Sequence, residues 1–235
     1  MIQRIYNDMW SRFRCAIESN ECEIDSHILD MPGDNRRGIT ALAYLNQDGS
    51  RVLNEIMNFQ NEVKSLDPHQ YYYPSSDIHM TILSVISCTP GFLLSDINVD
   101  SYTRIFESVF SGSGPIEVQY RGVTASPGCV VIQGFPVGDG LEVLRKNLRK
   151  EVLKSGLRSN LDTRYRIEAA HSSLIRFCKP LNNGAQLFNL CNRYRNHLFG
   201  SITFNSCELV FNNWYQSSAV TETLARCSLL SKGRV

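Results

Sequence analysis

The chain of 235 residues is 43% hydrophobic and 20% charged, which supplies enough apolar material for a substantial core and argues against intrinsic disorder. Its 24 Lys and Arg against 23 Asp and Glu give a formal net charge of +1, which argues against a strongly basic nucleic-acid coat and a polybasic membrane anchor. No run approaches the ~18 apolar residues of a transmembrane helix, and the N-terminus lacks the apolar segment of a secretory signal, so we expect a cytoplasmic protein without a membrane partner.

Residues 1–37 are predicted to form an N-terminal helical appendage. Apolar side chains recur there at four-residue intervals, at Ile5, Met9, Phe13 and Ile17. An acidic segment that contains proline and glycine follows this stripe and ends the appendage. The rest of the chain, 38–235, is predicted to be a single domain with two lobes.

From residue 38 onward, apolar patterns typical of strands and helices alternate in a fixed order. In the first stretch, strands are expected at about 39–45, 77–85 and 116–121, and helices at about 50–63 and 99–111. In the second stretch, strands are expected at about 129–135, 170–177, 201–211 and 217–228, and helices at about 139–156 and 183–199. A loop is expected before the second strand of the first stretch, and it carries Tyr71, Tyr72 and Tyr73.

The two stretches share the order strand, helix, strand, helix, strand, and so repeat one plan. The first strand and the middle strand are 41 residues apart from Gly38 to His79, and 43 residues apart from Gly128 to His171. The repeat predicts two lobes, at about 38–126 and 127–235, in a pseudo-twofold α+β structure with a cleft between them.

Each middle strand carries a histidine that is followed two positions later by a hydroxyl residue. These pairs are His79 with Thr81 and His171 with Ser173. Side chains two positions apart on a strand point to the same face, so each strand presents an imidazole beside a hydroxyl. The same alternation places four apolar residues on that face: Leu83, Val85, Ile175 and Phe177. The alternative is a pair of structural histidines, but matching positions in two matching halves favour a shared site.

At these motifs the sequence resembles the two-histidine (2H) phosphoesterase superfamily, which includes the 2′-5′ RNA ligase-like and cyclic phosphodiesterase proteins. The family is marked by two His-x-Thr/Ser motifs, each followed by an apolar residue, here His79-Met80-Thr81-Ile82 and His171-Ser172-Ser173-Leu174. In the ligase-like branch an arginine often stands five residues after the second histidine, here at Arg176. Two features depart from the pattern. Ser173 replaces the commoner threonine but keeps the hydroxyl, and residues 1–37 have no obvious counterpart.

The resemblance extends over about 38–228 and implies a bilobal fold with two antiparallel sheets, flanked by helices, around a central cleft. The two motifs are expected to face each other across that cleft. Simple alternation would turn Arg176 away from His171, so a β-bulge or a long reach of its side chain is needed to bring it into the site. Otherwise Arg176 is a solvated surface residue.

Two histidines and two hydroxyls suit the cleavage of a phosphodiester. Because the unperturbed pKa of histidine is about 6.5, one imidazole can take a proton from water or a ribose hydroxyl, while the other protonates the departing ribose oxygen. Thr81 and Ser173 can donate hydrogen bonds to phosphate oxygens, and Arg176 can add a charge-assisted contact. This scheme needs no metal and no cofactor, and no metal-binding spacing flanks the motifs.

The eight cysteines form no C-x-x-C pair, and the closest two, Cys15 and Cys22, are seven residues apart. This spacing is unlike that of zinc fingers or thioredoxin-type redox motifs. We therefore expect buried or unreactive thiols in a reducing compartment, without a disulfide framework.

The expected function is a metal-independent phosphodiesterase that acts on cyclic (2′,3′-type) or 2′-5′-linked nucleotides or on RNA ends, as a monomer without an obligate protein partner. Two alternatives stay open: a nucleotide- or RNA-binding module with little turnover, and RNA end joining at the same site. Tyr71, Tyr72 and Tyr73 can stack on a base, or they can instead pack against the lobe surface. Further candidates for base contacts are Tyr120, Arg121, Trp214 and Tyr215.

Overall fold

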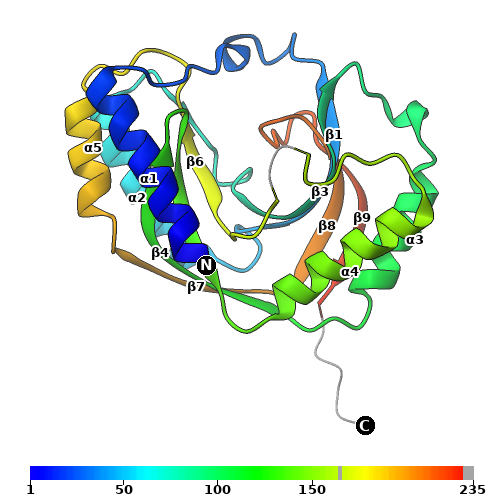
Figure 1. The fold of residues 1–235 in the computed structure, drawn as a ribbon. Coiled ribbons are helices and arrows are strands. Elements are labelled where there is room, and N and C mark those ends of the chain that lie inside the picture. The colour runs from blue at the N-terminus through cyan, green and yellow to red at the C-terminus, as the bar shows by residue number, and fades with distance from the viewer. Residues whose placement is uncertain (164–165, 230–235) are drawn as a thin grey trace.

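Two antiparallel sheets form the framework of this computed structural model, which describes residues 1–163 and 166–229 (Figure 1). In spatial order, the first sheet contains β3 (His79–Pro90), β1 (Arg36–Tyr44), β8 (Ser206–Asn212) and β9 (Glu222–Ser228). The second sheet contains β2 (Tyr71–Tyr72), β6 (Ser172–Arg176), β5 (Cys129–Pro136), β4 (Ile116–Ser126) and β7 (Leu198–Phe204). Strand neighbours pair antiparallel in both sheets, as predicted.

Helices flank both sheets. They are α1 (Ile2–Ser19), α2 (Ser50–Leu66), α3 (Val99–Phe110), α4 (Gly140–Ser155) and α5 (Gly184–Arg193), with short 3₁₀ turns η1 (Ser26–Asp30) and η2 (Leu94–Asp96). α3 and α4 pack beside the first sheet, whereas α1, α2 and α5 pack on the second (Figure 1). The predicted α+β architecture of two helix-flanked sheets is confirmed.

Each sheet takes strands from both halves of the sequence. β4 precedes residue 127 but lies in the second sheet, and β8 and β9 from the second half complete the first sheet. The predicted boundary between 126 and 127 therefore does not coincide with the division between the sheets. The physical reason is local, because β4 and β5 are joined by a two-residue turn and pair as a hairpin.

The N-terminal helix forms where the apolar stripe predicts it, and it packs into the core rather than standing apart from it. Tyr6 and Phe13 are both fully buried. The Tyr6 hydroxyl donates to the Gly134 carbonyl oxygen at 2.8 Å and accepts from the Gly134 amide at 3.0 Å. The Thr124 hydroxyl donates to the Tyr6 carbonyl at 2.9 Å, so α1 is bonded directly to the hairpin of the second sheet.

Two predicted elements differ in the structure. The helix expected over 183–199 ends at Arg193, and the strand expected over 201–211 divides into β7 and β8. Leu198 continues the helical spacing of the apolar residues before it, but the residues from Leu198 onward pair with β4. Pairing at the edge of the second sheet therefore overrides the local helical pattern.

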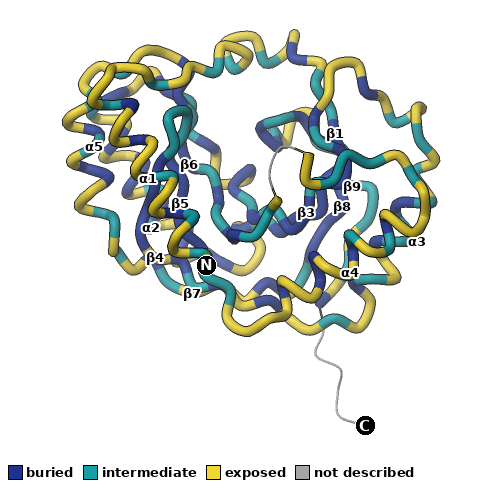
Figure 2. The backbone as a smooth tube through the Cα atoms, viewed as in Figure 1, coloured by how far each residue is buried: buried dark blue, intermediate teal, exposed yellow. Residues whose placement is uncertain are grey.

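Burial follows the sheets, as Figure 2 shows, with the strands largely dark and the outer faces of the helices exposed. A single apolar cluster runs through both sheets and the inner faces of the helices. Within 1–163 and 166–229, none of the helices has both the length and the apolar character needed to cross a bilayer.

Candidate active site

Strand β3 carries a β-bulge directly after its motif hydroxyl. Thr81 pairs with Leu42 and Leu83 pairs with Ala41, so Ile82 is an extra residue on this strand. One extra residue reverses the alternation of side chains beyond it. Leu83 is therefore buried in the core and does not continue the face of the motif.

Strand β6 has the same irregularity at the equivalent position. Ser173 pairs with Val131 and Ile175 pairs with Val130, which leaves Leu174 as the extra residue. The bulge places Arg176 on the same face as Ser173. It is therefore the β-bulge, one of the two possibilities considered from the sequence, that brings this arginine into the site.

The bulges also correct the prediction for the apolar residues that follow the motifs. Leu83, Val85, Ile175 and Phe177 are fully or almost fully buried, and among the described cleft residues none of them appears. Polar side chains take their places on β3, where Ser84 and Ser87 join Thr81 along the cleft. The sequence signal for these two serines was the three-residue spacing of hydroxyl residues after the motif. It was missed because strict alternation of side chains along the strand was assumed.

One cleft between the sheets brings the two motifs together. His79 and Thr81 line it from β3. Ser173 and Arg176 line it from β6, and His171 from the position directly before that strand. The remaining lining side chains are Thr40, Tyr73, Ser84, Ser87, Cys88, Asp162, Thr163, Ile167, Asn212, Trp214 and Gln216. The predicted histidines, hydroxyls and arginine thus share one cavity.

Among the described residues, one hydrogen bond holds the His79 ring. Its Nδ1 lies 2.7 Å from the carbonyl oxygen of Asp77. Because a carbonyl only accepts, Nδ1 carries the proton, and Nε2 is the basic nitrogen of the neutral ring. Burial lowers the pKa of His79, while the bond to the Asp77 carbonyl and the charge of Asp77 oppose that shift.

His171 lies in a different electrostatic setting. Burial, together with the positive charges of Arg145 and of protonated His79, lowers its pKa to about 4. Its Nδ1 is buried and has no hydrogen-bond partner among the described residues. A proton on His79 therefore disfavours a second proton on His171.

Arg145 supports the site from outside the lining of the cleft, and the sequence prediction missed it. It lies on α4 with 3% of its surface exposed, and its side-chain hydrogen bonds within the described part of the chain go to backbone carbonyl oxygens. Two of these belong to the first motif, at Ile82 (2.8 Å) and Thr81 (2.9 Å). The other two precede the second motif, at Glu168 (2.8 Å) and Ala169 (2.9 Å). One guanidinium therefore ties the two motif segments together.

The pKa of Arg145 is lowered to about 10 by burial and by the charge of Arg149, so it remains cationic at neutral pH. A signal for it existed in the sequence, because Arg145 stands four residues after Leu141 on the apolar stripe of α4. A charged residue on a buried helix face needs partners, but the sequence does not reveal that these are the motif carbonyls.

Arg176 is not a solvated surface residue, since only 18% of its side chain is exposed. Its Nε donates to the Tyr73 hydroxyl at 3.5 Å, and its Nη1 lies 3.7 Å from a carboxylate oxygen of Asp25. The rings of Trp214 and Tyr215 lie 5.8 and 5.9 Å from the guanidinium carbon.

The three consecutive tyrosines do not act as one loop. Tyr71 and Tyr72 form the edge strand β2, paired with Arg176 and Ile175 of β6, so the predicted loop is wrong at these two positions. Main-chain pairing with the motif strand supplies the reason. Of the three, only Tyr73 is among the described residues that line the cleft.

The first two tyrosines pack instead. The Tyr71 ring lies edge-on to Tyr73 at 5.0 Å and 5.9 Å from Tyr215, and the Tyr72 hydroxyl donates to the Asp67 carbonyl at 2.6 Å. Among the other aromatic candidates, Trp214 lines the cleft, whereas Tyr120 is fully buried.

The candidate Arg121 is placed elsewhere, with its guanidinium 4.6 Å from the centre of the Phe135 ring. Within the described ranges, no group of three or more His, Cys, Asp or Glu side chains has the arrangement to hold a metal ion.

Comparison with known proteins gives the fold. No family model and no curated protein sequence matches the chain. TT0787 of Thermus thermophilus is similar in structure, with a TM-score of 0.57 and 16% identity over 83% of this chain and 99% of that one. A protein described as a phosphoesterase has a TM-score of 0.50 and 11% identity over 83% of this chain and 99% of its own. This chain has the two-histidine phosphoesterase fold. E. coli LigT complexed with 3′-AMP is more distant, with a TM-score of 0.49 and 12% identity over 83% of this chain and 99% of LigT.

Proposed function

We propose that this protein is a metal-independent phosphodiesterase that cleaves cyclic (2′,3′-type) or 2′-5′-linked phosphodiesters of nucleotides or RNA ends. One observation carries the proposal: His79 on β3 of the first sheet and His171, directly before β6 of the second, line a single cleft with two hydroxyls and a guanidinium. Phosphoryl transfer requires a base for the nucleophile, an acid for the leaving oxygen and donors for the phosphate charge, and this set contains all three. One protein with this fold is described as a phosphoesterase, the class of activity proposed here.

The environments of the two histidines support different roles. Burial lowers the pKa of both rings, but at His79 the Asp77 carbonyl that accepts from Nδ1 opposes this shift, so we assign His79 as the general acid. His171 has the charge of Arg145 near it and its Nδ1 has no partner within the described chain, so it stays neutral and acts as the base.

In this mechanism, neutral His171 takes a proton from water as the water oxygen attacks phosphorus. The bond between phosphorus and the ribose oxygen breaks, and that oxygen receives the proton of His79. Thr81, Ser173 and Arg176 donate hydrogen bonds to the phosphate oxygens, whose negative charge increases in the transition state. Proton exchange with solvent then restores both rings.

Turnover of a nucleoside 2′,3′-cyclic phosphate in EDTA tests the proposal. We expect hydrolysis by the parent protein to be unaffected by chelation, and His79→Ala and His171→Ala each to lower kcat by about 10²–10⁴-fold. His69→Ala is the matched control, because His69 is exposed and outside the cleft, and it should act like the parent. Activity that disappears in EDTA or survives both cleft substitutions would refute the proposal.

A change of leaving group separates the acid from the base. p-Nitrophenolate departs without a proton, so His79→Ala should lose much less activity on a nucleoside p-nitrophenyl phosphodiester than on a ribose-linked ester. His171→Ala should be equally impaired on both. The reverse pattern would exchange the two roles.

The same assays decide between the proposal and its alternatives. Nucleotide binding without turnover by the parent protein would favour a binding module. Products of greater length from a mixture of 2′,3′-cyclic and 5′-hydroxyl RNA ends would favour end joining at this cleft.

A further inference from the structure

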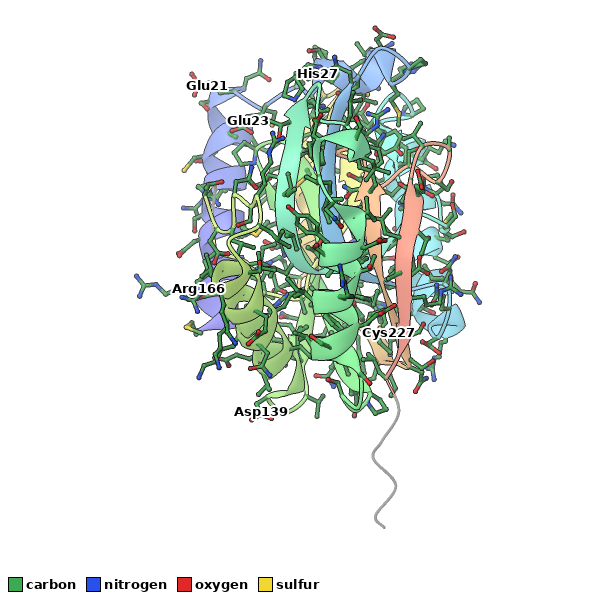
Figure 3. The ribbon with its side chains drawn as sticks, turned by 90° about the vertical axis from the view of Figure 1, so that its right-hand side faces the viewer. Glu21, Glu23, His27, Asp139, Arg166 and Cys227 are labelled. Atoms are coloured by element: carbon green, nitrogen blue, oxygen red, sulfur yellow. The ribbon has the colours of Figure 1, made fainter. Side chains whose placement is uncertain are left out.

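A segment of the N-terminal region crosses between the two sheets at one end of the molecule. This bridging segment, residues 20–35, runs from the end of α1 on the second sheet to the start of β1 in the first (Figure 1). Its Glu21, Glu23 and His27 lie together at that end, opposite Asp139 and Cys227 (Figure 3). The sequence offered no role for this part of the chain.

Backbone hydrogen bonds fix the bridging segment to the second sheet. The Glu23 amide donates to the Pro127 carbonyl at 3.0 Å, beside the turn between β4 and β5. The Asp25 amide donates to the Phe177 carbonyl at 2.8 Å, directly after β6. Asp25 is therefore held next to the end of the strand that carries Arg176.

The Asp25 carboxylate faces Arg176, which lines the cleft, and the buried Tyr215. One oxygen lies 3.7 Å from Nη1 of Arg176, and the other accepts from the Tyr215 hydroxyl at 2.9 Å. The side chains of Asp25 and Arg176 are only 17% and 18% exposed. Solvent screening between these charges is therefore weaker than for a surface pair.

The network continues into the first sheet. The Tyr215 hydroxyl accepts from Nη2 of Arg36 at 3.0 Å, and Arg36 makes a two-bond pair with Asp34 at 2.8 and 2.7 Å. Charges alternate along this network from Arg176 to Asp34, and Asp25 connects the guanidinium of the cleft to it. The carboxylate is thus fixed from both sheets.

Arg176 retains donors for a substrate. Its hydrogen bond to Tyr73 and its ion pair with Asp25 engage Nε and Nη1, and a guanidinium carries more N–H groups than these contacts use. A long arginine side chain is flexible unless it is held, and preorganised donors are more effective than mobile ones.

From these contacts we propose that Asp25 is a positioning residue that holds the Arg176 guanidinium in the orientation in which it binds the substrate phosphate. The inference rests on the proposed function, because it assigns Arg176 to phosphate binding. It gives the bridging segment the role of completing a site whose reacting groups all come from elsewhere in the chain.

A double-mutant cycle tests this role. Asp25→Asn should lower kcat/KM for a nucleoside 2′,3′-cyclic phosphate by about tenfold, mainly through a higher KM, while Asp25→Glu should keep most of the activity. In an Arg176→Met background, Asp25→Asn should cause no further loss beyond about twofold. Glu23→Gln is the matched control, because it removes the same charge from an exposed position on the same segment.

The inference would be overturned by an Asp25→Asn protein with the kcat/KM of the parent, or by an equal loss with and without Arg176. If Asp25→Asn lowers Tm but its effect on kcat/KM does not depend on Arg176, Asp25 has a structural role only, and the inference is also overturned. The same four proteins can also be compared by the Kd for inorganic phosphate, measured by calorimetry, which requires no turnover. The role of Asp25 is therefore tested even if the protein hydrolyses no ester, an outcome that would refute the proposed function alone.

Discussion

The neutral state of His171 makes the stability of the fold depend on pH. Its pKa is 6.5 in an unfolded chain and about 4 in the structure, because burial and the charges of Arg145 and His79 disfavour the imidazolium. Between these two values the unfolded chain binds a proton that the folded chain does not, so the free energy of unfolding rises with pH. This contribution is complete above pH 6.5 and is lost as the pH falls through 4.

The magnitude follows from the difference between the two pKa values. At about 1.4 kcal/mol per pKa unit, it corresponds to about 3 kcal/mol over the whole range, of which about 2 kcal/mol is lost between pH 7 and pH 4.5. His171→Gln removes the titration while keeping a polar side chain of similar size. We expect the parent protein to lose about 2 kcal/mol more than this variant between those two pH values.

Urea unfolding at pH 7 and pH 4.5 measures the difference, with His69→Gln as the control that replaces an exposed histidine. The control should lose stability as the parent does. Equal losses for the parent and His171→Gln, or an NMR titration of the His171 ring near its ordinary pKa, would refute the electrostatic account of the site.

Two further substitutions test the packing that supports the site. Arg145→Met leaves four carbonyls without their donor, two of them in buried hydrogen bonds, and should lower the free energy of unfolding by about 3 kcal/mol in urea. Lys146→Met on the exposed face of α4 should change it by less than about 0.5 kcal/mol. Gly134→Ala places a methyl group against the Ala170 carbonyl beside the second motif and should lower Tm by about 10 °C or more, while Gly140→Ala, which meets open space, should leave Tm unchanged or raise it slightly. If the two substitutions within either pair had similar effects, the contacts described for Arg145 or Gly134 would be contradicted.

The sequence was sufficient to find the parts of the site that alternate regularly. His79 and Thr81, like His171 and Ser173, lie two positions apart before any irregularity, so period-two reasoning held for them. The matching order of elements in the two halves also predicted that both pairs would meet in one cleft.

Beyond the motif hydroxyls, sequence reasoning failed for a specific physical reason. A β-bulge depends on how two strands pair, and neither the extra residue at Ile82 nor that at Leu174 changes the composition of its strand. Ser84, which the bulge turns into the cleft, was therefore missed, and Arg176 could be assigned only on the condition that a bulge exists.

Contacts between segments that are far apart in the chain could not be predicted from the sequence either. Asp25 and Arg176 are separated by 151 residues, and Arg145 binds carbonyls whose identity depends on the docking of α4 against both motif segments. The distribution of strands between the sheets depends on such contacts too, since the repeat predicts the order of the elements but not which sheet each strand joins.

The most direct test of the central claim is the position of a phosphate group in crystals soaked with a nucleoside monophosphate. We expect the phosphorus to lie between the imidazoles of His79 and His171, with a ring nitrogen of each within hydrogen-bond distance of a phosphate oxygen. A phosphate that contacts only one of these rings, or that binds outside the cleft, would contradict the two-histidine mechanism.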